Sequence, residues 1–265
     1  MSALDDEMLA LMRFVSERTI MPRWRNLATG DVIEKSQNEL VTIADREAEE
    51  FLAEALAKLA PDVPIVGEEA AHADSSVLDR LSGPCWIVDP IDGTHNYAHG
   101  RTPFGIMVAL ADGGEAIAGW IYDPVKDRFC HARRGEGAFV NGERIAARPT
   151  GSEPPVAAIS VIFLDEARRE SVNSHVAPHY RVVETPRCAA EQYPRLVLGE
   201  NDVSFFERTL AWDHAAGVLF LNEAGGKVCR PDGSAYRVDE IERTGMIGAA
   251  SPSLWDGLAA LYAKL

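Results

Sequence analysis

The sequence predicts an α/β protein whose N-terminal half is of the α+β kind. Helical spacing of apolar residues near the N-terminus is followed, between residues 105 and 140, by short strand-like runs separated by turns. From residue 156 onward, strand-like and helical segments alternate, which is typical of a layered α/β arrangement. We therefore divide the chain into an N-terminal half, residues 1–150, and a C-terminal half, residues 151–265.

The N-terminal half begins with helical patterns and continues with strands. Apolar residues recur at helical spacing in residues 4–20 and 38–59, and Pro61 ends the second pattern. Strand-like runs separated by turns then predict an antiparallel meander, followed by a tight turn at Asn141-Gly142. The shorter predicted elements are a strand at 65–67, a helix at 75–81, a strand at 85–88, and meander strands at 106–111, 116–122 and 129–133.

A boundary is predicted at residues 148–155, RPTGSEPP, where proline, glycine and serine concentrate. Beyond it, each strand-like run is followed by a helical pattern, and we expect Pro194 to interrupt one of these helices. The predicted strands are 156–161, 180–183, 203–206 and 246–249, and the predicted helices are 167–176, 188–198, 213–223 and 254–265.

Composition and charge exclude several classes of protein. Of the 265 residues, 46% are hydrophobic and 25% charged, which is ordinary for a globular enzyme and argues against a disordered, collagen-like or coiled-coil chain. The net charge of −15 argues against direct nucleic-acid binding by a basic surface. No apolar run reaches about 18 residues, so no membrane span or membrane partner is expected.

The N-terminus and the cysteines favour a cytoplasmic location. The first residues, MSALDDEML, are acidic and lack the basic-then-apolar order of a secretion signal. The four cysteines lie far apart and form no CxxC pair, which argues against a zinc site or a disulfide framework. Reduced thiols are the simpler interpretation.

Two acids stand in one stiff turn after a predicted buried strand. Asp89 ends the apolar run, Pro90 prevents a simple continuation of the strand, and Gly93 allows a close backbone approach just after Asp92. Thr94 is expected to cap a helix that follows. Taken alone, the stretch is best explained as an ordinary turn with an Asp cap.

Other acids occupy comparable positions. Glu68 follows a predicted strand, and Asp213 stands at the start of an apolar helix, where taken alone it is interpreted as an N-cap. Asp45, taken alone, is interpreted as a solvated helix residue. Because Mg²⁺ prefers carboxylate and carbonyl oxygens held in fixed geometry, acids at several element ends suggest a divalent-cation site.

Together, these segments resemble the inositol monophosphatase family. GEE at 67–69, DPIDGTHNY at 89–97 and WDHAAG at 212–217 resemble its three signatures, in the same order. Further matching segments are Lys35, LVTIADREAE at 40–49 and RRGEGAFVNGERI at 133–145. The family consists of Mg²⁺-dependent, Li⁺-sensitive phosphatases of small phosphorylated polyols. The resemblance therefore implies a layered α-β-α-β-α sandwich and a homodimer.

The resemblance also implies the metal ligands. Glu68, Asp89 and the backbone carbonyl of Ile91 resemble the ligands of a first Mg²⁺. Asp89, Asp92 and Asp213 resemble those of a second, and Glu68 would help to hold a third, weaker ion. Two metal ions can clamp the attacking and leaving oxygens of an in-line displacement, and they let an acidic site bind an anionic substrate.

Catalytic and substrate-binding roles follow from the same resemblance. Thr94, oriented by Asp45, resembles the pair that positions and activates the attacking water, so that no phosphoenzyme is required. With Glu68 these two are the implied catalytic residues. The amides of Gly93 and Thr94 would hold phosphate oxygens. The full set expected to contact substrate is Asp92, Gly93, Thr94, Arg187, Ala189, Glu207 and Asp213.

Two positions depart from the family pattern. Ala189 fits a Gly-x-Ala element that contacts substrate hydroxyls, but Arg187 stands where glycine is usual. The family places a hydroxyl-binding Glu seven residues before the metal-binding Asp, which points to Phe206, whereas Glu207 is six residues before Asp213. Arg187 is either a surface residue at a helix start or a contact to a second phosphate or a carboxylate of the substrate.

The sequence therefore predicts a Mg²⁺-dependent phosphatase of a small phosphomonoester, with an inositol-1-phosphate-like polyol phosphate as the first candidate. Histidinol phosphate, fructose 1,6-bisphosphate and a 3′-phosphorylated nucleotide remain open within the same chemistry. A regulatory protein that keeps the fold but binds RNA polymerase or ribosomal components is the alternative of another class. The presence of every matched metal ligand favours catalysis.

Overall fold

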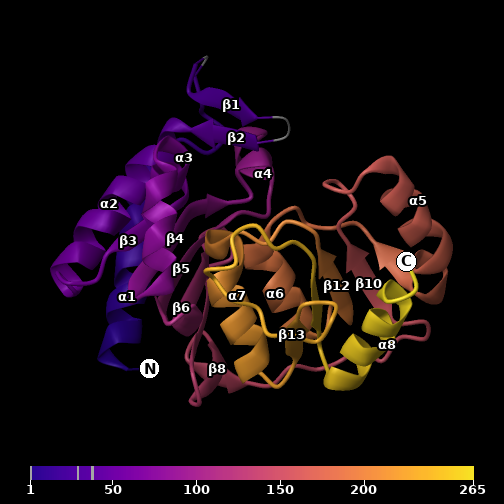
Figure 1. The fold of residues 1–265 in the computed structure, drawn as a ribbon. Helices are drawn as coiled ribbons and strands as arrows, with labels where there is room; N and C mark the ends of the chain where they lie inside the picture. The colour runs from indigo at the N-terminus through magenta and orange to yellow at the C-terminus, as the bar shows by residue number, and fades with distance from the viewer. Residues whose placement is uncertain (1, 29, 37–38) are drawn as a thin grey trace.

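Five layers of secondary structure build the fold, in the order helix, sheet, helix, sheet, helix, from left to right in Figure 1. This order confirms the predicted α/β class and layered sandwich. The computed structural model describes residues 2–28, 30–36 and 39–265, and of residues 35, 36 and 39 it describes only the backbone. The side chain of Lys35, and residue 38 at the predicted start of a helix, therefore lie outside the described part.

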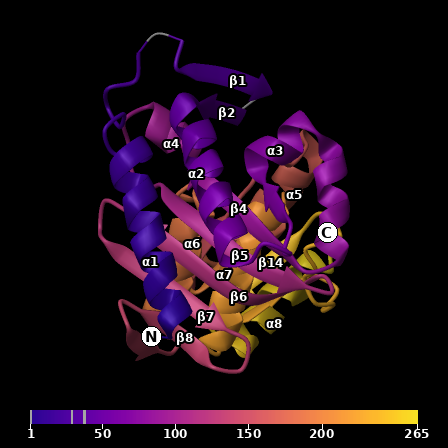
Figure 2. The same ribbon diagram turned by 90° about the vertical axis from the view of Figure 1, so that its left-hand side faces the viewer.

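Two long helices cover the outer face of the first sheet, as Figure 2 shows. They confirm the first two predicted helices, apart from the start of the second. Met8 and Leu52 contribute apolar side chains from these helices to a core that includes Trp86 and Trp120 of the sheet. The helices are α1 (Ala3–Val15), which continues as a π-helical turn η1 (Ser16–Ile20), and α2 (Ile43–Leu59).

The first sheet has seven strands in the order β3-β4-β5-β6-β7-β8-β9. β3 and β4 are parallel, and every later pair of neighbours is antiparallel, which confirms the meander. Asn141-Gly142 forms the predicted turn between β8 and β9. The strands are β3 (Ile65–Gly67), β4 (Cys85–Asp92), β5 (Gly105–Asp112), β6 (Glu115–Asp123), β7 (Arg128–Arg133), β8 (Gly137–Val140) and β9 (Glu143–Ile145).

The middle layer consists of α6 (Ala189–Leu198) and α7 (Ala211–Glu223). Glycine permits α7 to lie close to its neighbours. A Cβ on Gly217 would lie 2.0 Å from the Tyr193 ring of α6, and one on Gly119 of β6 would lie 2.8 Å from the Cα of Ala216. The core around α7 contains residues from both sides of residue 150. The division into two halves stays a prediction.

The second sheet and its helices complete the sandwich. The strand order is β11-β10-β12-β14-β13, with β10 parallel to β11 and β12, and β14 antiparallel to both neighbours. The outermost helices share a core with this sheet that includes Val172 and Leu258. The elements are β10 (Val156–Ile159), α5 (Glu166–His175), β11 (Arg181–Val183), β12 (Val203–Phe206), β13 (Lys227–Cys229), β14 (Met246–Ala249) and α8 (Pro252–Tyr262).

Several local expectations were wrong or incomplete. Residues 39–42 form a strand, β2, that pairs with β1 (Val32–Ser36), so α2 begins only at Ile43, after a capping box at Thr42. α6 continues through Pro194, which is buried in the packed middle layer. The smaller elements comprise α3 (Glu68–Ala73), η2 (Ser75–Ser82), α4 (Thr94–Ala98) and η3 (Ala177–His179). Of all the elements, β1, β9, β13, α3 and η3 were not predicted from the sequence.

Within the described ranges, every helix is too short or too polar to cross a bilayer. All four cysteines are free thiols, and three of them are buried.

Candidate active site

The cavity that contains the predicted site lies where β4 ends and α4, α6 and α7 begin. Its volume is about 180 Å³. Residues far apart in the chain meet here because β4 belongs to the first sheet and α6 and α7 to the middle layer. The cavity is lined by nearly all the predicted site residues: Glu68, Asp89, Ile91, Asp92, Gly93, Thr94, Arg187, Ala189, Glu207 and Asp213.

Three carboxylates converge in the cavity. One oxygen from each of Asp89, Asp92 and Asp213 lies within 4.8 Å of the others. Asp89 and Asp92 are buried, and the side chain of Asp213 is 18% exposed. Burial, with the charges of Glu68 and Asp92, raises the pKa of Asp89. Burial and the charge of Asp213 raise the pKa of Asp92 to about 7.

The local backbone explains how β4 presents its two acids. β4 continues past Pro90, contrary to expectation, but its pairing with β5 is irregular between Asp89 and Asp92. Such an irregularity tolerates proline and redirects side chains. The amide of Ile91 donates to Asp89 Oδ1 at 3.0 Å, and the amide of Ala190 donates to Asp92 Oδ2 at 2.7 Å. Asp92 therefore joins β4 to the first turn of α6.

Asp213 lies in the first turn of α7 and is not its N-cap, which is Leu210. The interpretation as a capping residue was therefore wrong. Arg208 Nη2 lies 3.8 Å from Asp213 Oδ2. His214 accepts a hydrogen bond from the Tyr193 hydroxyl at 2.8 Å, and its other ring nitrogen donates to the Arg208 carbonyl at 3.0 Å. This pairing requires a neutral imidazole, and burial lowers the pKa of His214 to about 3.

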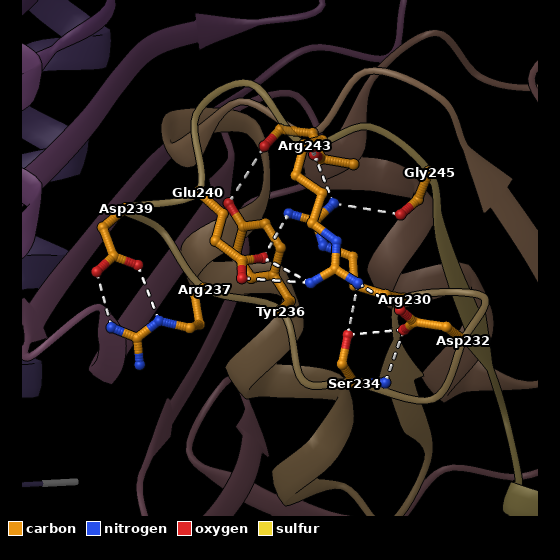
Figure 3. A network of polar contacts seen from close by, with 10 residues as sticks. Arg230, Asp232, Ser234, Tyr236, Arg237, Asp239, Glu240, Arg243 and Gly245 are labelled. Carbon is orange, nitrogen blue, oxygen red and sulfur yellow. Dashed lines mark hydrogen bonds and ion pairs between the residues drawn. The ribbon is translucent and has the colours of Figure 1, made fainter.

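A buried arginine supports the loop that leads into α7. Arg230 is fully buried and donates to Thr209 Oγ1 at 2.8 Å and to the Gly245 carbonyl at 3.2 Å. Figure 3 shows its guanidinium beside Tyr236 and Glu240. Because Thr209 lies between β12 and α7, this contact fixes the approach to Asp213.

Glu68 begins α3 and lines the same cavity. The N-cap residue Gly67 has no side chain to cap this helix. Glu49 of α2 takes that role, because its carboxylate accepts the amides of Glu69 and Ala70, each at 2.8 Å. Glu49 is 7% exposed. Its position therefore determines where the first turn of α3, and with it Glu68, is held.

Thr94 and Asp45 are in contact, as the resemblance implies. The Thr94 hydroxyl lies 3.1 Å from Asp45 Oδ1 and 2.9 Å from the Ile91 carbonyl oxygen. Asp45 Oδ2 accepts the amide and hydroxyl of Thr42, at 2.8 and 2.6 Å. Burial raises the pKa of Asp45 to about 7, although the Thr42 hydrogen bonds act in the opposite direction.

Two interpretations of single residues are corrected here. Asp45 is completely buried and is not a solvated helix residue, because it closes the capping box of α2. Thr94 does not cap α4 through its side chain. The N-cap is Gly93, whose φ of 86° lies in the left-handed region that favours glycine.

The outer wall contains the residues that depart from the family pattern. Glu207 lines the cavity, but its carboxylate pairs with Arg168 of α5 at 2.7 Å. Phe206 also lines the wall. Arg208 stacks over Phe163, with 4.7 Å between the guanidinium carbon and the ring centroid.

The carboxylate cluster fits a hard divalent cation. Mutual repulsion and burial disfavour three charged carboxylates so close together, and a bound cation would remove this cost. The converging donors are all oxygens, which suits Mg²⁺ better than zinc.

Comparison with known proteins identifies the family. The model of the inositol monophosphatase family matches residues 7–264. The chain belongs to this family. An inositol-1-monophosphatase of Bacillus subtilis is 34% identical over 202 residues, 75% of each chain. A fructose-1,6-bisphosphatase/inositol-1-monophosphatase of Thermotoga maritima is 31% identical over 225 residues, 84% of this chain and 83% of the relative.

Solved structures agree with the family assignment. The extragenic suppressor protein suhB from Bartonella henselae matches with a TM-score of 0.84 and 27% identity, over 99% of both chains. As a member of the inositol monophosphatase family, which is metal-dependent, the chain is a phosphatase that hydrolyses phosphoric monoesters.

Sequence reasoning missed three residues that contribute to this phosphatase site. Glu49 lies one helical turn after Asp45, and this i, i+4 spacing is the signal that could have revealed it. Arg168 lies 39 residues before its partner Glu207, and no local pattern connects them. Arg230 stands in irregular chain, where neither its burial nor its contact with Thr209 has a sequence signature.

Proposed function

We propose that this phosphatase hydrolyses a small phosphomonoester in a Mg²⁺-dependent reaction in which water attacks phosphorus directly. An inositol-1-phosphate-like polyol phosphate is the first candidate substrate. The observation that carries the proposal is the convergence of Asp89, Asp92 and Asp213 in one cavity beside the Thr94–Asp45 pair.

The proposed metal ligands are those that the family resemblance implies. Glu68, Asp89 and the Ile91 carbonyl would hold one Mg²⁺, Asp89, Asp92 and Asp213 a second, and Glu68 would contribute to a third. Mg²⁺ held by these residues would neutralise the acids, attract the phosphate and lower the pKa of bound water. Sensitivity to Li⁺ is proposed from the same family resemblance.

Thr94 and Asp45 are proposed to orient the attacking water. When the Thr94 hydroxyl donates to Asp45, its oxygen lone pairs can accept a hydrogen bond from water, which directs the water oxygen toward phosphorus. The amides of Gly93 and Thr94 are proposed to donate to the phosphate oxygens, and no covalent phosphoenzyme forms.

The residues at the substrate end of the cavity are compatible with several phosphomonoester substrates. Ala189, Glu207 and Asp213 are the proposed contacts to the alcohol portion. Histidinol phosphate, fructose 1,6-bisphosphate and a 3′-phosphorylated nucleotide are the alternatives. The relative from Thermotoga maritima is named for both a bisphosphate and a monophosphate activity, so both kinds of substrate belong in one panel.

Phosphate release from this panel tests the proposal. Chelator-treated protein should release no phosphate and should recover activity with Mg²⁺. Calorimetric titration with Mg²⁺ provides a readout independent of turnover. Full activity in the presence of the chelator would refute the metal-dependent mechanism.

Location and assembly are further proposals. The free cysteines support a reducing, cytoplasmic location. A homodimer is proposed from the family resemblance and is tested by light scattering after size exclusion. The regulatory alternative predicts a stable complex with RNA polymerase or ribosomal components in a pull-down, and the complete acidic cluster favours catalysis.

A further inference from the structure

Arg187 has a backbone conformation that residues with side chains seldom adopt. Its φ is 54°, in the left-handed region that glycine occupies without strain. The residue is exposed and lines the cavity. A strained residue at the mouth of an active site is maintained by its surroundings, and such strain is concentrated at functional sites.

The chain on both sides of Arg187 is attached to the β4–α4 turn. The side-chain amide of Asn96 in α4 donates to the Pro186 carbonyl at 2.9 Å. On the other side, the Cys188 thiol lies 3.6 Å from the Asp92 carbonyl oxygen, and the Ala190 amide donates to Asp92. The Cα of Arg187 is therefore held in a fixed place beside the acidic cluster.

The charge of Arg187 remains available to a ligand. Among the residues that the structure describes, no carboxylate forms an ion pair with it, whereas Arg168 pairs with Glu207 and Arg208 lies near Asp213. The charge of Arg187 also acts on His95, which lines the same cavity. Burial is the larger cause that lowers the pKa of His95, and the charge of Arg187 is the second. A guanidinium in this position offers a planar pair of donors to phosphate or carboxylate.

We propose that Arg187 is a specificity-determining residue that binds a second anionic group of the substrate, while the scissile phosphate occupies the acidic cluster. The inference rests on the proposed phosphatase site. Within the proposed substrate class, it favours phosphomonoesters that carry a second phosphate or a carboxylate over inositol 1-phosphate.

The left-handed conformation makes Arg187→Gly a favourable test, since glycine adopts this φ more easily than arginine and the fold should be preserved. Arg25→Gly is the matched control, because Arg25 is also exposed with a φ of 66° but lies outside the cavity. Arg187→Lys retains the positive charge but loses the planar pair of hydrogen-bond donors of the guanidinium.

The assay measures kcat/KM at saturating Mg²⁺ for inositol 1-phosphate, fructose 1,6-bisphosphate and 3-phosphoglycerate. The wild type should prefer at least one of the two substrates that carry a second anionic group. Arg187→Gly should reduce that preference by about 10- to 150-fold, the range expected for a charge-assisted hydrogen bond, and Arg187→Lys should retain part of it. Comparison of fructose 1,6-bisphosphate with 3-phosphoglycerate shows whether the second anionic group that Arg187 binds is a phosphate or a carboxylate.

The outcomes separate this inference from the proposed function. If the wild type releases phosphate from none of the substrates, the proposed function fails. If it is active and Arg187→Gly leaves the substrate ratio unchanged, the specificity role is refuted. An equal change in Arg25→Gly would also refute it, because the effect would then come from net charge.

Discussion

Removal of the Glu49 carboxylate should both destabilise the protein and weaken Mg²⁺ binding. In Glu49→Ala, the amides of Glu69 and Ala70 lose their acceptor, and α3 has no other side-chain cap from its N-cap residue. Each hydrogen bond to a charged group contributes about 1.5–3 kcal/mol. Two such bonds set an upper limit of about 6 kcal/mol. Because burying the carboxylate offsets part of this, we expect a loss of about 2–4 kcal/mol in the free energy of unfolding.

The effect on Mg²⁺ follows from the position of Glu68. It is the first residue of α3, so a loosened helix start increases the entropy that is lost when Glu68 is held as a ligand. We expect the Mg²⁺ dissociation constant to rise about 10-fold, which is within the range seen when residues that orient a metal ligand are removed. Urea unfolding measures the stability, and calorimetry of Mg²⁺ binding to the folded protein measures the affinity.

Glu50→Ala provides a matched control, since Glu50 is the exposed neighbour on α2 and its removal changes the net charge equally. This control should resemble the wild type in both measurements. If Glu49→Ala binds Mg²⁺ as tightly as the control does, the link from Glu49 to Glu68 is incorrect. If its stability is also unchanged, the carboxylate does not act as the cap of α3.

Three further predictions concern catalysis and pH. Asp92→Asn should lower kcat on the order of 10²-fold or more and leave the fold intact, and near-normal turnover would show that Asp92 is only a turn residue. Thr94→Ala should lower kcat with little change in substrate affinity, whereas a phosphothreonine trapped during turnover would overturn the direct attack by water. Burial acts to raise the pKa of Asp5, but hydrogen bonds from Ser2, Trp120 and Arg133 outweigh it and lower the pKa from 3.8 to about 2. At about 1.36 kcal/mol per pH unit, this lowering contributes about 2 kcal/mol of stability above pH 4, which is lost as the pH falls from 4 to 2. Asp5→Asn should therefore be about 2 kcal/mol less stable at pH 7 in urea unfolding, and the difference from the wild type should shrink below pH 4; a constant difference would contradict the assignment.

The parts of the fold predicted correctly are those with strong local patterns. β5, β6 and β7 are apolar-rich runs separated by short turns, and α7 is a long apolar segment with Asp213 and alanines at its start. Residues 39–42 were included in the helix predicted over residues 38–59, although the apolar face that predicted it begins only at Ala44. Their pairing with β1 depends on a partner strand and has no signal within the segment itself.

The candidate site shows a similar limit. Asp89, Asp92 and Asp213, which the resemblance implies as metal ligands, converge in one cavity although they lie up to 124 residues apart, and their role as ligands stays a prediction. Single-residue reasoning misjudged Asp45 because burial depends on tertiary contacts. The two bonds that define its role come from Thr42, close in sequence, and its third comes from Thr94, in a different element.

The close packing of α7 affects how the substrate specificity of this protein can change during evolution. Gly217 and Ala216 contact α6 and β6 within one turn of Asp213, so this acid cannot be displaced without separating two layers of the protein. The segments around Phe163 and Arg187 belong to loops at the rim of the cavity and are not confined between sheets. Mutations there can alter which alcohol is accepted without moving the carboxylates, so new specificities can arise by small steps while hydrolysis is maintained.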